Sequence, residues 1–132
     1  MSKTDVGELQ TFAFTDLAQI TINRDIGKLS ERLVAAEVGG AAKSARTDLG
    51  IRYIDVVADS LAIEVKTGYQ TLTDDIAQQI AKDAHILAGN KLGITEYEWW
   101  FRVNPLTGEG GASAELVALL ESEGIRVRMF TL

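Results

Sequence analysis

The stretch from residue 52 to residue 68 constrains the fold of this chain more than any other. Two runs of alternating apolar and polar residues, 52–58 and 61–67, are separated by the turn-forming pair Asp59-Ser60. Both runs are rich in Val and Ile, which favour extended structure. The pattern predicts two antiparallel strands joined by a two-residue turn.

Three charged side chains are expected on one face of this hairpin. Side chains alternate between the two faces of a strand, so Glu64 and Lys66 point the same way. A two-residue turn places Asp55 directly across from Glu64, on that same face. Opposed carboxylates destabilise the pairing, whereas a bound divalent cation would reverse that effect because hard metals take carboxylate oxygens. The hairpin therefore predicts a metal site; the alternative is a solvated strand face with an ion pair.

Composition limits the other possibilities. The 132 residues, 46% of them hydrophobic, suit one globular domain over 1–132 with its own core. The chain has no cysteine and one histidine, which excludes disulfides, thiolate metal sites and His-rich zinc sites. We expect no membrane segment and no signal peptide, because no apolar run has the required length. The net charge of -6 argues against a protein that simply coats nucleic acid.

The remaining pattern predicts an α/β fold. Residues 1–23 lack a clean period and form a poorly defined N-terminal segment. The expected elements are a helix over 25–39, a connection or strand over 41–51, the hairpin, a helix over 73–88, a strand over 96–103, a helix over 113–123 and a strand over 125–132. Helices between strands imply crossovers, and hence a mixed central β-sheet flanked by helices on both faces.

The helix over 25–39 is apolar nearly all round, which is typical of a buried helix. Leu29, Leu33 and Ala36 recur at helical spacing, and Val34 belongs to a second apolar side. Glu31 lies on that second side, where a carboxylate needs a partner. The alternative for Glu31 is a surface position beside a basic neighbour.

Basic side chains precede the hairpin in the sequence. Lys43, Arg46 and Arg52 cluster there, and basic groups beside a metal site suit phosphate contact. A solvated run of charge is the equal alternative. Trp99 and Trp100 on the strand over 96–103 are expected in the core rather than as base-stacking platforms.

The pattern Asp55-x8-Glu64-x-Lys66 on a hairpin resembles the PD-(D/E)xK nucleases, which have the restriction-endonuclease fold. The resemblance implies that Asp55 and Glu64 bind Mg²⁺ or Mn²⁺ and that Lys66 positions the attacking water. The string from Gly27 to Glu31 is similar to the first helix of archaeal Holliday junction resolvases, which implies a third metal ligand at Glu31; Glu37 is the competitor for the same role.

A longer set of motifs, over about 46–132, resembles the C-terminal nuclease domains of contact-dependent inhibition and Rhs toxins. The motifs are Arg52…Asp55, Glu64-Val-Lys66-Thr67-Gly68, Gln79-Ile-Ala-Lys-Asp83, Trp99-Trp100-Phe101 and Gly124-Ile-Arg-Val127. In the nuclease superfamily a glutamine on the helix that follows the hairpin often reaches the site, which implies that Gln79 flanks it, together with Thr67. The alternative for Gln79 is an amide at the edge of the core. The resemblance of the longer motif set also implies a toxin domain carried by a secreted or cell-surface protein, acting in the target-cell cytoplasm and neutralised by a cognate immunity protein.

The expected function is thus a metal-dependent endonuclease, with DNA favoured over tRNA as the substrate. Three alternatives stay open. They are an RNA- or tRNA-cleaving toxin of the same fold, a resolvase-like DNA-processing enzyme, and a module that binds nucleic acid or protein without cutting.

Overall fold

The structure is a computed structural model that describes the backbone of residues 16–131 and the side chains of residues 22–131. Most of the predicted N-terminal segment, 1–23, therefore lies outside the described residues. The elements are α2 (Asp16–Val38), β1 (Ala41–Thr47), β2 (Gly50–Ala58), β3 (Leu61–Thr67), α3 (Asp74–Gly89), the short 3-10 helix η1 (Lys91–Gly93), β4 (Glu96–Arg102), α4 (Ala114–Ser122) and β5 (Arg126–Met129).

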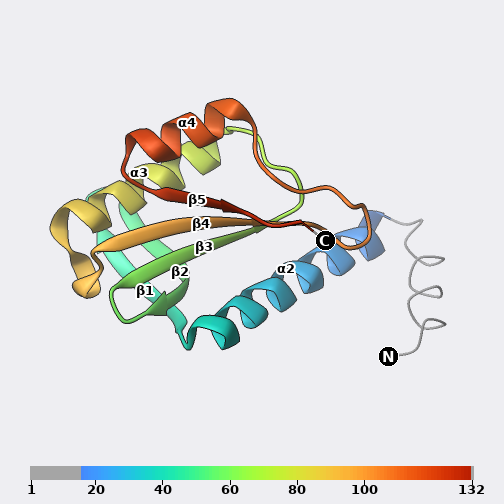
Figure 1. Ribbon diagram of the computed structural model, residues 1–132, viewed down its shortest axis with the longest axis horizontal. Helices are drawn as coiled ribbons and strands as arrows, with labels where there is room; N and C mark the ends of the chain where they lie inside the picture. The colour runs from blue at the N-terminus through green and yellow to red at the C-terminus, as the bar shows by residue number, and fades with distance from the viewer. Residues whose placement is uncertain (1–15, 132) are drawn as a thin grey trace.

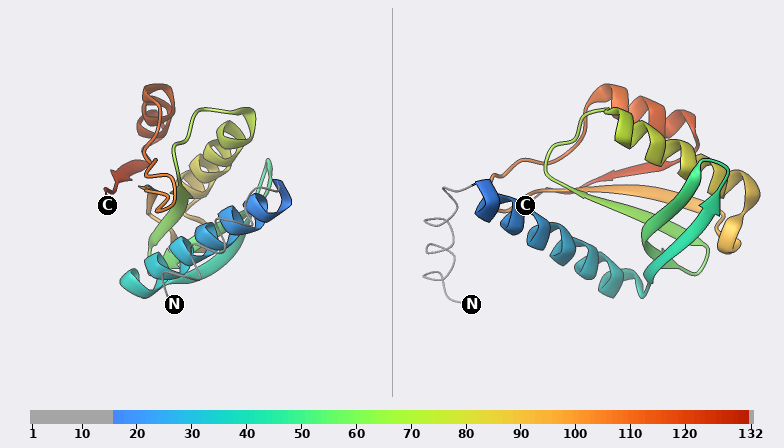
Figure 2. Two further views of the ribbon diagram at one scale, coloured as in Figure 1. Left: turned by 90° about the vertical axis from the view of Figure 1, so that its right-hand side faces the viewer. Right: turned by 180° about the vertical axis from the view of Figure 1, so that it is seen from behind.

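The strands form one five-stranded mixed sheet in the order β1-β2-β3-β4-β5. The first three strands are antiparallel neighbours, while β3, β4 and β5 run parallel and are connected through α3 and α4. Helix α2 lies along one face of the sheet, and α3 and α4 cover the other (Figures 1 and 2). The predicted α/β class and mixed, helix-flanked sheet are confirmed.

Two apolar clusters hold these layers together. On the side of α3 and α4, Trp99 and Phe101 pack with Ile80 and Leu116. On the side of α2, Trp100 packs with Val34 and three strand residues. The adjacent tryptophans thus point to opposite faces of β4, and both are buried, as expected for a central strand.

Helix α2 differs from the prediction in its extent and in its buried side. It begins at Asp16, so the helix expected over 25–39 starts nine residues earlier. Its buried residue Val34 faces the sheet, but Leu29 and Leu33 are 55% and 53% exposed. The expectation of an all-round buried helix was wrong because only one layer, the sheet, packs against α2 among the described residues.

The hairpin that connects β2 and β3 has the predicted turn. Ala58 pairs with Leu61 across Asp59-Ser60, and Asp59 takes the left-handed conformation with φ 53°. The paired residues continue only as far as Val56 and Ile63. Beyond that point β2 and β3 no longer form a regular ladder, and the candidate site lies at this end of it.

A β-bulge in β2 accounts for the change. Ala41 pairs with Val57 and Lys43 pairs with Ile54, so one residue of β1 opposes two residues of β2. The extra residue falls at positions 55–56. Bulges bend a strand and re-aim a side chain, and they are frequent beside active sites.

Candidate active site

Asp55 lies at this bulge, where the regular backbone pairing of β2 with β3 ends, and its side chain bonds to β3 instead. Its Oδ2 accepts a hydrogen bond from the backbone N–H of Val65 at 2.9 Å. In the register of the hairpin, Asp55 would be the next residue opposite Glu64. The structure therefore keeps Asp55 beside β3, but through a side-chain bond rather than a backbone pair.

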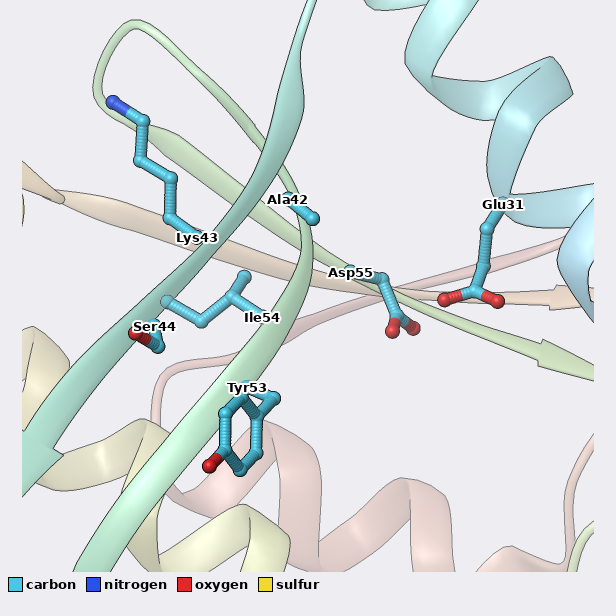
Figure 3. A pocket seen from close by; sticks show the side chains of 7 residues that line it. All are labelled: Glu31, Ala42, Lys43, Ser44, Tyr53, Ile54 and Asp55. Atoms are coloured by element: carbon cyan, nitrogen blue, oxygen red, sulfur yellow. The ribbon is translucent and has the colours of Figure 1, made fainter.

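Glu31 reaches the same place from α2. Glu31 and Asp55 line an open pocket of about 450 Å³, together with Ser44 of β1 and Tyr53 of β2. Figure 3 shows the two carboxylates pointing toward one another across the pocket. The structure thus brings together two of the three predicted metal ligands, from a helix and from a strand.

Glu64 lies next to Asp55 but is more deeply buried, at 4% exposure. Its Oε2 is 2.9 Å from the ammonium Nζ of Lys66, and its Oε1 is 3.0 Å from Arg52 Nη2. Lys66 Nζ also donates to Gln79 Oε1 on α3 at 2.8 Å. Glu64 and Lys66 therefore lie on one face of β3, as strand alternation predicts, and Gln79 contacts Lys66 from α3.

Arg52 has a different place from the one predicted. It was expected to contact phosphate, but it is only 7% exposed. Its guanidinium donates to both carboxylate oxygens of Asp83, at 2.8 and 3.3 Å, and to the backbone carbonyl of Tyr53 at 2.9 Å. The side chain of Arg52 points inward from β2, opposite the buried Ala45. Arg52 therefore contacts Glu64 inside the protein and does not lie on the surface.

Asp83 holds Arg52 in place from the core, a role that the sequence did not predict. It has no exposed surface, and besides Arg52 it accepts a hydrogen bond from Trp99 Nε1 at 2.9 Å. Asp83, Arg52, Glu64 and Lys66 thus form a chain of alternating charge inside the protein. A signal existed in the sequence: an acid beside the core stripe of a helix requires a buried partner.

The pKa values of two carboxyl groups at the site, Asp55 and Glu64, are raised. Burial raises the pKa of Asp55 to about 6, and the neighbouring carboxyl group of Glu31 adds to this shift. Burial, together with the charge of Asp55, raises the pKa of Glu64 to about 7 despite Lys66 and Arg52. Both acids would be held more readily as carboxylates if a cation were added.

The other predicted residues contribute no charge contact to the carboxylates. Lys43 lies exposed on β1 and lines the pocket, but in Figure 3 its ammonium group points away from the two carboxylates, and Arg46 lies exposed farther along β1. Thr67 ends β3, and its backbone carbonyl accepts from Gln70 Nε2 at 3.2 Å. Among the described residues, none of these three side chains contacts the network of Asp83, Arg52, Glu64 and Lys66.

The donor set suits a hard divalent cation, although the arrangement is not a finished metal centre. Among the described side chains, those of residues 22–131, no three His, Asp or Glu groups converge as a set able to hold a metal. Glu64 Oε1 is nevertheless buried without a hydrogen bond, since Arg52 Nη2 is near it but not directed at it. A buried carboxylate oxygen that lacks a hydrogen bond, next to the carboxyl group of Asp55, fits a cation with oxygen ligands.

Comparison of the chain with protein-family models, with curated proteins and with solved structures finds no match. None of the helices in the described part of the chain is both long and apolar enough to cross a bilayer.

Proposed function

We propose that this protein is a metal-dependent nuclease that hydrolyses phosphodiester bonds with water. The observation that carries the proposal is the meeting of Glu31 and Asp55 at one pocket, directly beside the Glu64–Lys66 pair. Burial of Asp55 and Glu64 raises the pKa of both carboxyl groups, and a third carboxylate stands beside them, so this cluster is costly to the fold and a bound cation would offset the cost.

Each residue then has a role in the reaction. Glu31, Asp55 and Glu64 would hold Mg²⁺ or Mn²⁺ through carboxylate oxygens. The bound cation would polarise the phosphate and lower the pKa of a water molecule. Lys66, fixed between Glu64 and Gln79, would orient the water or stabilise the charge that develops on the phosphate.

The finer proposal is a DNase toxin domain with the restriction-endonuclease-like core. Its support is the order of motifs that resembles contact-dependent inhibition and Rhs toxins, now joined by the Lys66–Gln79 contact between two of those motifs. Under this proposal the partners are nucleic acid and a cognate immunity protein. Growth arrest on expression in a bacterial cytoplasm, relieved in a Lys66→Met variant, would support it; tolerated expression of the wild type would favour a resolvase-like enzyme.

The first experiment is cleavage of plasmid DNA, single-stranded DNA and total RNA, with Mg²⁺, with Mn²⁺ and with chelator. We expect metal-dependent cleavage that falls by orders of magnitude in Asp55→Asn and Lys66→Met. Residues that do not line the pocket provide matched controls, the exposed Glu121→Gln and the half-buried Lys91→Ala, which should cut like the wild type. Intact substrates under every condition would refute the nuclease proposal.

A non-catalytic binding module is the second candidate, and one observation favours it. Both oxygens of Glu64 already lie against cations of the protein, so the carboxylate is partly neutralised without any metal. Calorimetric titration separates the two candidates. Binding of Mn²⁺ that is lost in Asp55→Asn supports the nuclease, whereas no binding at millimolar metal supports the module.

A further inference from the structure

The face of the β1–β2 hairpin that adjoins the pocket is left exposed by the part of the chain that the structure describes. Arg52, Ala45 and Thr47 turn inward, so the alternate positions of both strands turn to the other side. On that side Ser44 opposes Tyr53, and Arg46 opposes Ile51. These four residues, Ser44, Arg46, Ile51 and Tyr53, are all exposed, and we call them the hairpin platform.

Tyr53 is the most exposed large side chain of the platform. It is 71% exposed, although it lies inside a strand of the sheet. Its backbone carbonyl accepts from the buried guanidinium of Arg52 at 2.9 Å, so the strand beneath the ring is fixed. An exposed aromatic ring on a fixed strand is a surface on which a nucleic-acid base can stack.

The platform runs directly into the candidate active site. Tyr53 and Ser44 line the same pocket as Glu31 and Asp55, and Tyr53 precedes Asp55 by two residues of one strand (Figure 3). Two residues span about 6.6 Å along a strand, so a base on Tyr53 would belong to a nucleotide next to the phosphate at Asp55.

Charge on the platform complements a phosphate backbone. Arg46 is exposed and makes no ion pair with any residue from 22 to 131, in a chain whose net charge is -6. Because Arg46 lies beyond Tyr53 as seen from Asp55, it would meet a phosphate farther along the same strand of nucleic acid.

We infer that the hairpin platform binds an unpaired nucleic-acid strand, with a base stacked on Tyr53 and a phosphate at Arg46. This inference rests on the proposed nuclease function and names its substrate class. In a duplex the bases are already stacked and paired, so a base could reach Tyr53 only after the pairing had been broken. An unpaired strand meets no such cost, and the protein therefore prefers it to a duplex.

Fluorescence anisotropy of labelled oligonucleotides tests the inference. The probes are a single-stranded DNA, an RNA of the same sequence and the blunt DNA duplex, all in chelator so that no probe is cut. We expect tighter binding of the single strands than of the duplex. Tyr53→Leu should weaken single-strand binding about 5- to 150-fold, while Tyr53→Phe retains it because the ring is kept.

Two further variants sharpen the result. Tyr69→Leu changes an exposed tyrosine that does not line the pocket and should leave binding unchanged. Arg46→Gln should weaken binding of every single strand and lower the slope of log K against log salt by about 1. The matched control Lys91→Gln should not alter that slope.

The inference is overturned if Tyr53→Leu binds single strands within twofold of wild type, if the wild type binds none of them, or if the duplex binds as tightly as the single strand. Because the assay needs no cleavage, its result is separable from that of the nuclease test. Cleavage without dependence on Tyr53 would reject the platform alone. Tyr53-dependent binding by a protein that never cuts would reject the nuclease alone.

Discussion

At the scale of single residues, the candidate site depends on a buried side chain, Asp83, that does not line its pocket. Asp83 holds Arg52 through two hydrogen bonds, and Arg52 in turn lies against Glu64. Burial opposes the charge of Arg52, but the carboxylates of Glu64 and Asp83 raise its pKa overall, so the guanidinium stays charged. The position of Glu64 is thus set from within the core.

Asp83→Asn should therefore be strongly destabilising. It leaves a buried guanidinium with one carboxylate fewer, and breaking a buried ion pair from one side costs about 3–5 kcal/mol of unfolding free energy. Urea unfolding measures the loss. Asp75→Asn, at an exposed acid in the first turn of the same helix, is the control and should change little. A loss below about 1 kcal/mol for Asp83→Asn would show that the network does not support the site.

The sequence was informative about individual residues where strand alternation applied. It correctly placed Glu64 and Lys66 together because both belong to one regular strand, β3. It misplaced Arg52 because grouping that residue with Lys43 and Arg46 ignored the side of the strand on which each lies. A buried polar network also combines residues from β2, β3 and α3, and only the tertiary structure shows such a combination.

At the scale of elements, α2 shows what periodicity leaves open. Apolar residues occur on both sides of this helix, so its pattern alone could not select the buried side. In the structure Val34 packs against the sheet, and Leu33 remains half exposed. The bulge in β2 was equally hidden, because a single extra residue changes the register of two strands without altering either strand's composition.

Paired truncations in α2 test this assignment. Val34→Ala removes buried atoms and should cost about 2 kcal/mol of unfolding free energy, including the cavity that it leaves. Leu33→Ala removes a larger side chain but should stay within about 0.5 kcal/mol of wild type, because that side chain is exposed. Chemical unfolding of both variants gives the comparison. The reverse order of the two losses would mean that α2 packs through its other side.

At the scale of the whole molecule, the site should make stability depend on pH. The pKa of Asp55 is raised from 3.8 to about 6, and that of Glu64 from 4.5 to about 7. Between the unfolded and folded values the native state binds more protons than the unfolded state. In chelator, the contribution of these acids is therefore complete below about pH 4 and is lost as the pH rises through about 6 and 7.

Urea midpoints measured in chelator from pH 5 to pH 8 check this expectation. Stability should fall over that range, with each group contributing a slope of at most about 1.4 kcal/mol per pH unit. Asp55→Asn keeps an oxygen that can accept from Val65 N–H but removes the charge, so its profile should be flatter and its stability at pH 8 higher than wild type. A wild-type profile that rises toward pH 8, or one that Asp55→Asn leaves unchanged, would contradict this description of the site.

The bulge in β2 also has a consequence for how the chain tolerates changes of length. Deleting one residue at 55–56 would remove the bulge and leave residues 50–54 on their present faces, but the site would lose Asp55 or the extra residue that re-aims it. Deleting one residue at 53–54 would send residues 50–52 to the opposite face and expose Arg52. The exposed loop 105–108 has no such alternation to keep. Among descendants of this sequence, gain or loss of single residues should therefore accumulate in that loop, while β2 changes by substitution and keeps its length.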